Sequence, residues 1–466
     1  MKTLSQNNKG LSKLMIVIML GVIVLIIGGV IFIIIGSGTT PEPKPVTLTI
    51  WGVWDETSDF ESVIDAYRKA HPYVTINYSK KRYEEYENLL ISGWADEPST
   101  GPDIYAIPNS WVNKYKERYI TPLPESTKVA FYRIKKVLFK KETEIKYITE
   151  PSLTINDISR DFIDVVYNDV IFDGQIYALP LGINTLVMFY NKDLLNIAHL
   201  AQPPRTWNEF ANVVSKIAIV DEQNNILRAG AALGTYDNIS QASDIVTLLM
   251  LQNGTSMVTG DSVTFDQPSA YDVSYFPGEQ ALRFYTDFAL PEKAVYTWNE
   301  QMPKALDFFA EGKLAFFFGY QYQESDIQSK SRGLNYAIAS MPQVNPENEI
   351  NYANYWVYTV AKKTKNIDEA WDFLQYAAEA KRVKPYLESS QQTSVLRSIL
   401  NEQLADPDQS LFAQQALTAQ SWYHGNKPAE AEKHFGEMIQ NVVNNTMDIK
   451  QAITMAVKKI QAGYSL

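Results

Sequence analysis

The fold class follows from a stretch that begins Val46-Thr47-Leu48-Thr49-Ile50-Trp51. Apolar and polar residues alternate here, which is typical of a half-buried β-strand. A helical pattern follows, with Ser58 as the expected N-cap and Glu61 completing a capping box. A second strand over 73–78, a second helix over 81–94 and a third strand over 103–107 come next. This strand–helix alternation predicts an α/β lobe with a largely parallel sheet.

The alternation continues through the rest of the chain. Thr206 and Glu209 form another capping box, and Pro277 suits the first position of a helix. A chain of 466 residues is long for one core, so two α/β lobes are expected. The predicted strands cover 185–190 and 314–318, and the predicted helices cover 206–217, 241–252, 277–288, 303–311, 366–380 and 449–461.

The N-terminal segment has the features of a membrane anchor. Residues 14–35 are apolar or Gly and carry no charge, and a helix of that length spans a bilayer. Lys2, Lys9 and Lys13 precede it, which predicts that residues 1–13 are cytoplasmic and that everything after 36 is extracellular or periplasmic. Residues 36–45 form a Pro-rich linker. The alternatives are a cleaved signal peptide, whose apolar region would be shorter, and a buried core helix.

Composition argues against several classes of protein. The net charge of -11 argues against nucleic-acid binding, and the absence of Cys excludes disulfides, thiolate nucleophiles and a lipid-modified Cys. No metal-ligand pair, phosphate-binding loop or nucleophile elbow is present, so no metal, no cofactor and no catalytic residue is expected. The histidines fit surface or capping positions better than ligand positions: His71, His199, His424 and His434.

Aromatic residues are abundant, with 9 Trp, 28 Tyr and 20 Phe. Tyrosine combines an apolar face with a hydroxyl, as sugars combine apolar faces with hydroxyl edges, so some of these rings suit a sugar-binding surface. Most of the others belong in the core.

Residues 126–147 are conspicuously basic. We interpret them as a solvated helix face. The alternative is contact with an acidic partner surface or an anionic lipid headgroup.

Several motifs occur in a characteristic order between residues 46 and 466. Together they resemble the family 1 extracellular solute-binding proteins, the maltose-binding-like sugar receptors of ABC importers. The motifs are Leu48-Thr49-Ile50-Trp51, Gly101-Pro102-Asp103-Ile104, Asp173-Gly174-Gln175-Ile176-Tyr177-Ala178-Leu179-Pro180, Tyr190-Asn191-Lys192-Asp193-Leu194-Leu195, Pro203-Pro204-Arg205-Thr206-Trp207-Asn208-Glu209-Phe210, Phe309-Ala310-Glu311-Gly312-Lys313-Leu314-Ala315, Met341-Pro342 and Val360-Ala361-Lys362-Lys363-Thr364-Lys365-Asn366.

The resemblance implies a two-lobed periplasmic-binding-protein type II fold with a hinge. The first lobe would comprise 46–181 with 345–390, and the second 182–344 with 391–466. The chain would cross between lobes near Leu181 to Thr185, after Met341, and near Ser389 to Ser394. It further implies a monomer that works with ABC permease subunits. The chain departs from the family pattern in its transmembrane anchor, in a longer segment over 125–165 and in the sequence of the third crossing.

Ligand contacts in such folds come from loops at the carboxyl ends of strands. Trp and Tyr side chains there would stack on sugar faces, while Asp, Asn and Gln would hydrogen-bond hydroxyls. The candidates are Trp51, Trp54, Asp55, Asn109, Ser110, Trp111, Asn184, Tyr236, Asn238, Tyr320, Gln321, Asn354, Tyr355 and Trp356.

The predicted function is capture of a mono- or oligosaccharide for an ABC importer. A ligand sensor or adhesin of the same fold is an alternative, as is a surface glycoside hydrolase. A peptide, polyamine or phosphoester ligand is a further alternative. The candidate loops carry Asp55 but no Arg, which favours a neutral or cationic ligand.

Overall fold

A computed structural model describes residues 42–137 and 140–464. Residues 46–129 and 149–464 form one compact unit, and residues 42–45 and 130–148 belong to another. Within these described ranges no helix is both long and apolar enough to cross a membrane. The predicted anchor over 14–35 and the predicted cytoplasmic residues 1–13 lie outside the described residues.

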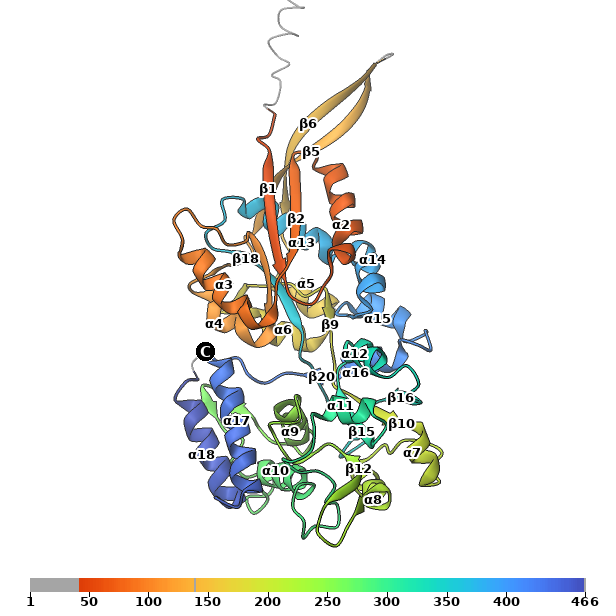
Figure 1. The fold of residues 1–466 in the computed structure, drawn as a ribbon. Helices are drawn as coiled ribbons and strands as arrows, with labels where there is room; N and C mark the ends of the chain where they lie inside the picture. The colour runs from red at the N-terminus through yellow and green to blue at the C-terminus, as the bar shows by residue number, and fades with distance from the viewer. Residues whose placement is uncertain (1–41, 138–139, 465–466) are drawn as a thin grey trace, which may run out of the picture. The chain divides into compact units, whose positions relative to one another are not determined.

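The first lobe of the larger unit is built on a five-stranded sheet of order β2-β1-β3-β18-β4 (Figure 1). β1 is parallel to β2 and β3, whereas β18 is antiparallel to β3 and β4. The predicted parallel arrangement of the first three strands is therefore confirmed, and the returning strand β18 adds the mixed character. The strands are β1 (Val46–Gly52), β2 (Val74–Lys80), β3 (Ile104–Pro108), β4 (Ile120–Thr121) and β18 (Trp356–Ala361).

Helices and a small hairpin complete this lobe. α2 begins one residue before the predicted cap Ser58, because Asp59 accepts the backbone N–H of Glu56 at 2.7 Å and makes Glu56 the N-cap. The elements are α2 (Thr57–Ala70), α3 (Tyr83–Ala95), η1 (Asn109–Trp111), α4 (Val112–Lys116), α5 (Ile155–Asp161), α6 (Asp164–Val170), β7 (Ile171–Phe172), β8 (Gln175–Ile176), α13 (Ile367–Ala378) and α14 (Ala380–Ser390).

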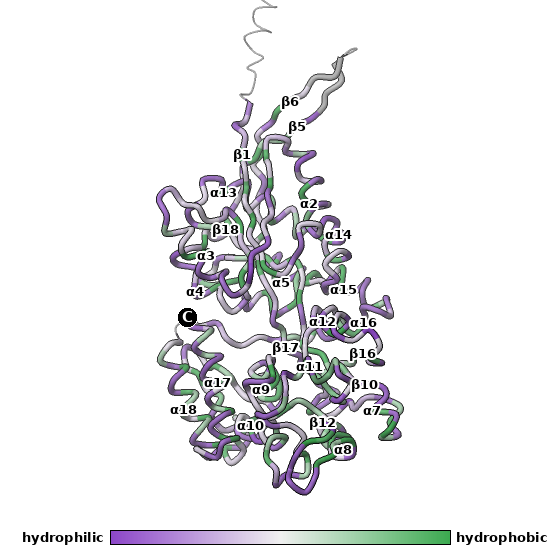
Figure 2. Tube along the Cα trace, viewed as in Figure 1, coloured by the Kyte–Doolittle hydropathy of each residue, from purple (hydrophilic) through white to green (hydrophobic). Residues whose placement is uncertain are grey.

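The second lobe is built on a five-stranded sheet of order β11-β12-β15-β10-β16. Both capping predictions hold here, since Thr206 accepts the N–H of Glu209 and Pro277 opens α10. Hydrophobic residues dominate α9, which is buried along most of its length (Figure 2). The strands are β10 (Val187–Asn191), β11 (Ile219–Val220), β12 (Ile226–Ala231), β15 (Leu314–Gly319) and β16 (Tyr336–Ala339). The other elements are α7 (Lys192–Ile197), α8 (Trp207–Ile217), α9 (Ala242–Gln252), β13 (Val258–Thr259), β14 (Ser262–Val263), α10 (Pro277–Asp287), α11 (Ala305–Ala310), α12 (Gln323–Lys330), α17 (Pro428–Val443) and α18 (Ile449–Gln461).

Short strand pairs join the segments that run between the two sheets. β9 (Gly182–Ile183) pairs antiparallel with β19 (Thr393–Ser394), and β17 (Asn351–Tyr352) pairs parallel with β20 (Ala419–Gln420). A further bridge joins Thr185 to Ala353. These pairs tie the segments that run between the two sheets to one another. α15 (Arg397–Gln403) and α16 (Ser410–Leu417) follow β19.

β5 (Ser126–Val137) and β6 (Lys140–Pro151) pair in a two-stranded sheet. The interpretation of 126–147 as a helix face is therefore wrong. Two β-branched residues, Thr127 and Val129, alternate with polar ones at the start of β5 and are buried, which is a period of two rather than 3.6.

We expect Gly278→Ala in α10 to lower the free energy of unfolding by about 1–3 kcal/mol. An added Cβ would lie 2.1 Å from the carbonyl oxygen of Phe265, and a backbone atom cannot yield easily. Gly333→Ala is the matched control, because its Cβ would meet nothing within 4 Å. Urea unfolding of both variants checks this, and equal midpoints would contradict it.

Candidate ligand-binding site

A cavity of about 900 Å³ lies where the loops of the two sheets face each other. The loop after β1 and residues of α2, α3 and β3 line it from the first lobe, and residues of α9, α12 and α17 line it from the second. The structure thus brings together most of the side chains predicted for the site. The predicted residues that line the cavity are Trp54, Asp55, Asn109, Ser110, Trp111, Asn184, Tyr320, Gln321, Asn354 and Trp356.

Four aromatic rings form a stacked row across this cavity. Trp54 stacks on Tyr83 with ring centroids 5.7 Å apart, and on Tyr322 at 5.8 Å. Tyr322 in turn stacks on Tyr320 at 5.8 Å. Trp54 and Tyr83 belong to the first lobe and the other two to the second. About half of the Trp54 side chain is exposed, although large aromatic rings are usually buried. We call Tyr83, Trp54, Tyr322 and Tyr320 the aromatic row.

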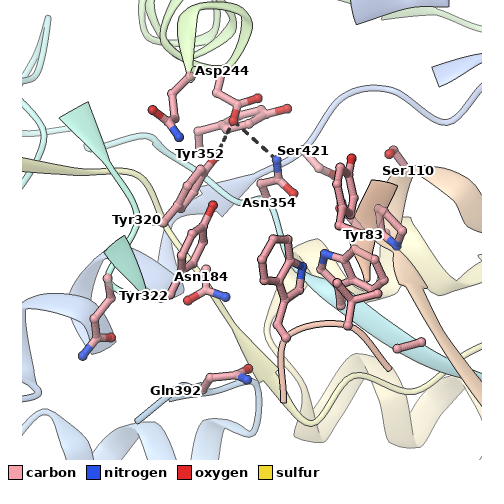
Figure 3. Close-up of a pocket in the computed structure, with 18 of the residues that line it drawn as sticks. Tyr83, Ser110, Asn184, Asp244, Tyr320, Tyr322, Tyr352, Asn354, Gln392 and Ser421 are labelled. Carbon is pink, nitrogen blue, oxygen red and sulfur yellow. Dashed lines mark hydrogen bonds between the residues drawn. The ribbon is translucent and has the colours of Figure 1, made fainter. Parts of the chain in front are cut away.

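Asp244, in the first turn of α9, faces the same cavity. The Tyr320 hydroxyl donates to its Oδ2 at 2.6 Å, and the Asn354 side-chain amide donates to the same oxygen at 3.4 Å (Figure 3). Burial raises the pKa of Asp244 to about 6, and the charge of Glu432 adds to the rise. A carboxylate with this environment is a strong hydrogen-bond acceptor for a ligand donor.

Asp55 lines the cavity, but its carboxylate already accepts several hydrogen bonds from other side chains of the protein. It accepts hydrogen bonds from the Tyr386 hydroxyl at 2.9 Å, from the Gln392 amide at 3.0 Å and from the Tyr358 hydroxyl. Burial raises the pKa of Asp55, and these hydrogen bonds oppose the rise. Its contacts join the end of β1 to α14 and to the third crossing segment, so Asp55 positions the wall of the cavity.

Four of the predicted residues do not line the cavity. Trp51 lies on β1 with the ammonium of Lys81 4.3 Å from its ring centroid. Tyr355 is fully buried, and its hydroxyl donates to Asp169 at 2.7 Å. Asn238 is also buried, bonded to the backbone carbonyls of Asn299 and Met302, and Tyr236 packs beside Gly436. Successive side chains of an extended segment point to opposite faces, which explains how Trp356 reaches the cavity while Tyr355 does not.

Several residues of the cavity escaped the sequence analysis. Tyr83 and Asp244 sit in the first turns of helices, and Glu432 is on α17, far along the chain from any candidate strand end. The search for strand-end loops could have found only Tyr322, which follows β15 by three residues. The missed residues include Tyr83, Asp244, Tyr322, Tyr352, Gln392, Ser421 and Glu432.

Asp169 on α6 is buried and accepts several hydrogen bonds, two of them from residues that line the cavity. It accepts from the Asn109 amide at 2.9 Å, from Tyr355, from the Ser421 hydroxyl and from Nε2 of His424 at 2.7 Å. Asn109 and Ser421 line the cavity. Asp169 therefore fixes two cavity residues that come from opposite ends of the sequence.

The described residues contain no group of His, Asp and Glu side chains arranged to hold a metal ion. The chemical character of the cavity is that of rings, amides, hydroxyls and carboxylates. Such a surface can stack on apolar faces and hydrogen-bond polar edges of a ligand.

The pKa of Asp244 predicts a pH-dependent stability. An unfolded Asp titrates near 3.9, so the folded ligand-free protein binds the proton more tightly, and the free energy of unfolding from this group falls as pH rises from about 4 to 6. We expect Asp244→Asn to remove part of this fall, on the order of 1 kcal/mol. Asp372, whose pKa is also raised to about 6, remains in the variant. Melting temperatures measured across this pH range check the difference, and identical slopes would argue against it.

The fold and the cavity are those of a binding protein with two lobes. The chain belongs to the family described as bacterial extracellular solute-binding protein, whose model matches residues 62–412. The galactooligosaccharide-binding protein of Bacillus subtilis is 22% identical over 443 residues, which cover 91% of this chain and 90% of that protein. The maltotriose-binding protein of Pyrococcus abyssi is 21% identical over 69% of this chain and 60% of its own length.

Solved structures share the fold. The cyclic alpha-maltosyl-1,6-maltose binding protein of Arthrobacter globiformis superposes with a TM-score of 0.69 at 19% identity, over 90% of this chain and 98% of that one. The predicted two-lobed α/β architecture is therefore confirmed.

Proposed function

We propose that the protein captures a carbohydrate in the cavity between its lobes and delivers it to an ABC importer. The observation that carries this proposal is the aromatic row, which faces a cavity otherwise lined by amides, hydroxyls and carboxylates. Rings of this kind stack on the apolar faces of sugars, and polar groups around them hydrogen-bond hydroxyls. The names of the relatives in Bacillus subtilis and Pyrococcus abyssi, both oligosaccharide-binding proteins, support the same ligand class.

Binding would couple to closure of the lobes. Trp54 and Tyr322 stand on different lobes, and Asn184 and Asn354 lie on crossing segments, where the backbone N–H of Asn354 donates to the carbonyl of Asn184 at 3.2 Å. A ligand that touches all of these makes more contacts in the closed form, so binding favours closure. A permease can distinguish the closed form from the open one by its surface.

Further features complete the proposal. The protein binds its ligand without chemical turnover, acts as a monomer and works outside the cytoplasm, tethered by residues 14–35. Membership in a family of extracellular binding proteins supports the location and the binding role. A sensor or adhesin of the same fold is the competing function, and it predicts that deletion of the protein leaves sugar uptake by the cell unchanged.

The test is thermal unfolding of the purified full-length protein against neutral and charged oligosaccharides, peptides and polyamines. A ligand at 100 times its dissociation constant adds about 2.7 kcal/mol to the free energy of unfolding and raises the melting temperature. Stabilisation by carbohydrates supports the proposal. Stabilisation by peptides or polyamines alone would refute the carbohydrate assignment while leaving the fold untouched.

A further inference from the structure

The cavity has an unusual balance of charge. Its lining includes the carboxylates of Asp55, Asp59, Asp244, Glu324 and Glu432, but no Lys, Arg or His among the described residues. The whole chain carries 42 Lys and Arg against 53 Asp and Glu, so the absence of cations here is local rather than a consequence of composition. None of these five carboxylates forms an ion pair with a described residue.

Three of the five carboxylates accept hydrogen bonds from other side chains of the protein. The donors to Asp55 are given above, Asp59 accepts from the Ser389 hydroxyl at 2.5 Å, and Glu324 accepts from the Tyr336 hydroxyl at 3.1 Å. The remaining two are Asp244 and Glu432. Asp244 accepts hydrogen bonds from Tyr320, Asn354 and Tyr352, fewer than the about four that a carboxylate can accept. Glu432 accepts no hydrogen bond from any described residue. These two carboxylates have capacity left for a ligand.

The charge of Glu432 raises the pKa of a residue on each lobe. Burial, and then the charge of Glu432, raises the pKa of Tyr83 on the first lobe. The same charge adds to the raised pKa of Asp244 on the second lobe. Burial raises the pKa of Glu432, and the charge of Glu432 disfavours the ionised state of Asp244, with no compensating cation among the described residues of the lining. A positively charged ligand group would relieve this repulsion.

A buried acceptor without a partner lies beside them. Gln241, next to the start of α9, is only 6% exposed although it lines the cavity, and its Oε1 has no hydrogen-bond partner in the described structure. Leaving a buried acceptor unsatisfied is unfavourable, so a ligand donor is expected here. Gln241 Oε1 and the carboxylates of Asp244 and Glu432 are all hydrogen-bond acceptors, so a ligand that contacts them must present hydrogen-bond donors.

The acidic character continues beyond this cavity. A neighbouring cavity of about 1020 Å³ shares five lining residues with the first, namely Gln321, Glu324, Gln328, Gln391 and Gln392. It adds four carboxylates and a single cation, Lys384, which is paired with Glu402 at 2.7 Å. The connected space has room for several sugar units.

We propose that the ligand is an oligosaccharide with free, protonated amino groups, and that Glu432 and Asp244 bind one of them while the aromatic row stacks on the sugar rings. This inference rests on the proposed function and narrows its ligand class. Carboxylates can also accept hydroxyl hydrogen bonds from a neutral sugar, but that would not require the exclusion of every cation from the lining. An acidic sugar would be repelled.

The experiment compares three trisaccharides on the full-length protein by calorimetry at about pH 6.5, where sugar amines, which are less basic than a Lys side chain, are largely protonated and most carboxyls are ionised. The probes are the trimer of glucosamine, the neutral trimer of N-acetylglucosamine and the anionic trimer of galacturonic acid. We expect the amine trimer to bind at least about 10-fold more tightly than its acetylated form, with a preference that shrinks at high salt. We expect no binding of the anionic trimer.

Variants locate the effect. Glu432→Gln and Asp244→Asn should each weaken binding of the amine trimer by about 10-fold and bring the ratio of the two affinities toward one. Glu430→Gln is the matched control on the same helix, since Glu430 is exposed, pairs with Lys427 and does not line the cavity. It should leave the affinity unchanged.

The outcomes separate the two proposals. Equal or tighter binding of neutral sugars overturns the amino-sugar inference and retains carbohydrate capture. Binding of a polyamine such as spermidine, with no binding of any saccharide, overturns both. A preference for the amine trimer that survives in Glu432→Gln and in Asp244→Asn also overturns the inference, because the charge would then be recognised elsewhere.

Discussion

Replacing Asp169 with Ala is expected to lower the free energy of unfolding by about 3–5 kcal/mol. Asp169 is fully buried and accepts hydrogen bonds from Asn109, Tyr355, Ser421 and His424. Removing the carboxylate leaves four buried or half-buried donors without their acceptor, and each pays a desolvation penalty. Urea unfolding followed by circular dichroism measures the loss.

The control for Asp169→Ala lies on the same helix. Asp164 is exposed and pairs with Arg397 at the surface, so Asp164→Ala should cost less than about 1 kcal/mol. Asp169→Asn should fall between the two variants, because it keeps the volume but loses the charge. A loss in Asp169→Ala no larger than that in Asp164→Ala would show that the buried hydrogen bonds contribute little.

Trp54→Ala is expected to raise the dissociation constant for the carbohydrate ligand by about 10- to 100-fold, since a buried aromatic contact contributes ~1.5–3 kcal/mol. Trp54 stands in the middle of the aromatic row, between Tyr83 and Tyr322. Its side chain is 51% exposed, so the melting temperature without ligand should change little. Calorimetric titration of the variant with the identified sugar provides the measurement.

A second pair of variants separates stacking from general loss of aromatic surface. Tyr322→Ala removes the partner ring on the other lobe and should also weaken binding. Tyr271→Ala removes a fully exposed ring outside the cavity and should leave the affinity as it is. Equal affinities in Trp54→Ala, Tyr322→Ala and the wild type would place the sugar elsewhere.

Local patterns predicted many of the elements well. Alternation in Val46–Gly52 predicts a strand because one face of it is buried, and Thr206 predicts a helix start because its side chain satisfies a backbone N–H within three residues. The interpretation of 126–147 as a helix face failed because Thr127 and Val129 are buried on either side of the exposed Lys128, which is the period of a strand.

Sequence patterns likewise predicted some residues of the ligand site correctly and others wrongly. Strand-end loops predicted Trp54 and Asn109, since the carboxyl ends of neighbouring parallel strands meet at one edge of a sheet. Asn354 instead precedes β18, whose amino end lies at the same edge because β18 runs antiparallel to β3. Tyr355 was also predicted to line the site. Its side chain points away from the cavity, because successive side chains of an extended segment face opposite ways, and its hydroxyl donates to Asp169.

The sequence by itself determined the two α/β lobes, because periodicity and helix capping depend on residues close together in the chain. Its composition alone determined the abundance of aromatic side chains and the absence of cysteine chemistry. Only the tertiary structure decided that Tyr83 and Tyr322, over two hundred residues apart, both stack with Trp54, and that Glu432 from α17 shares a cavity with Asp244. Contacts between side chains so distant in the chain depend on how the crossing segments bring the lobes together, and no local pattern encodes that geometry.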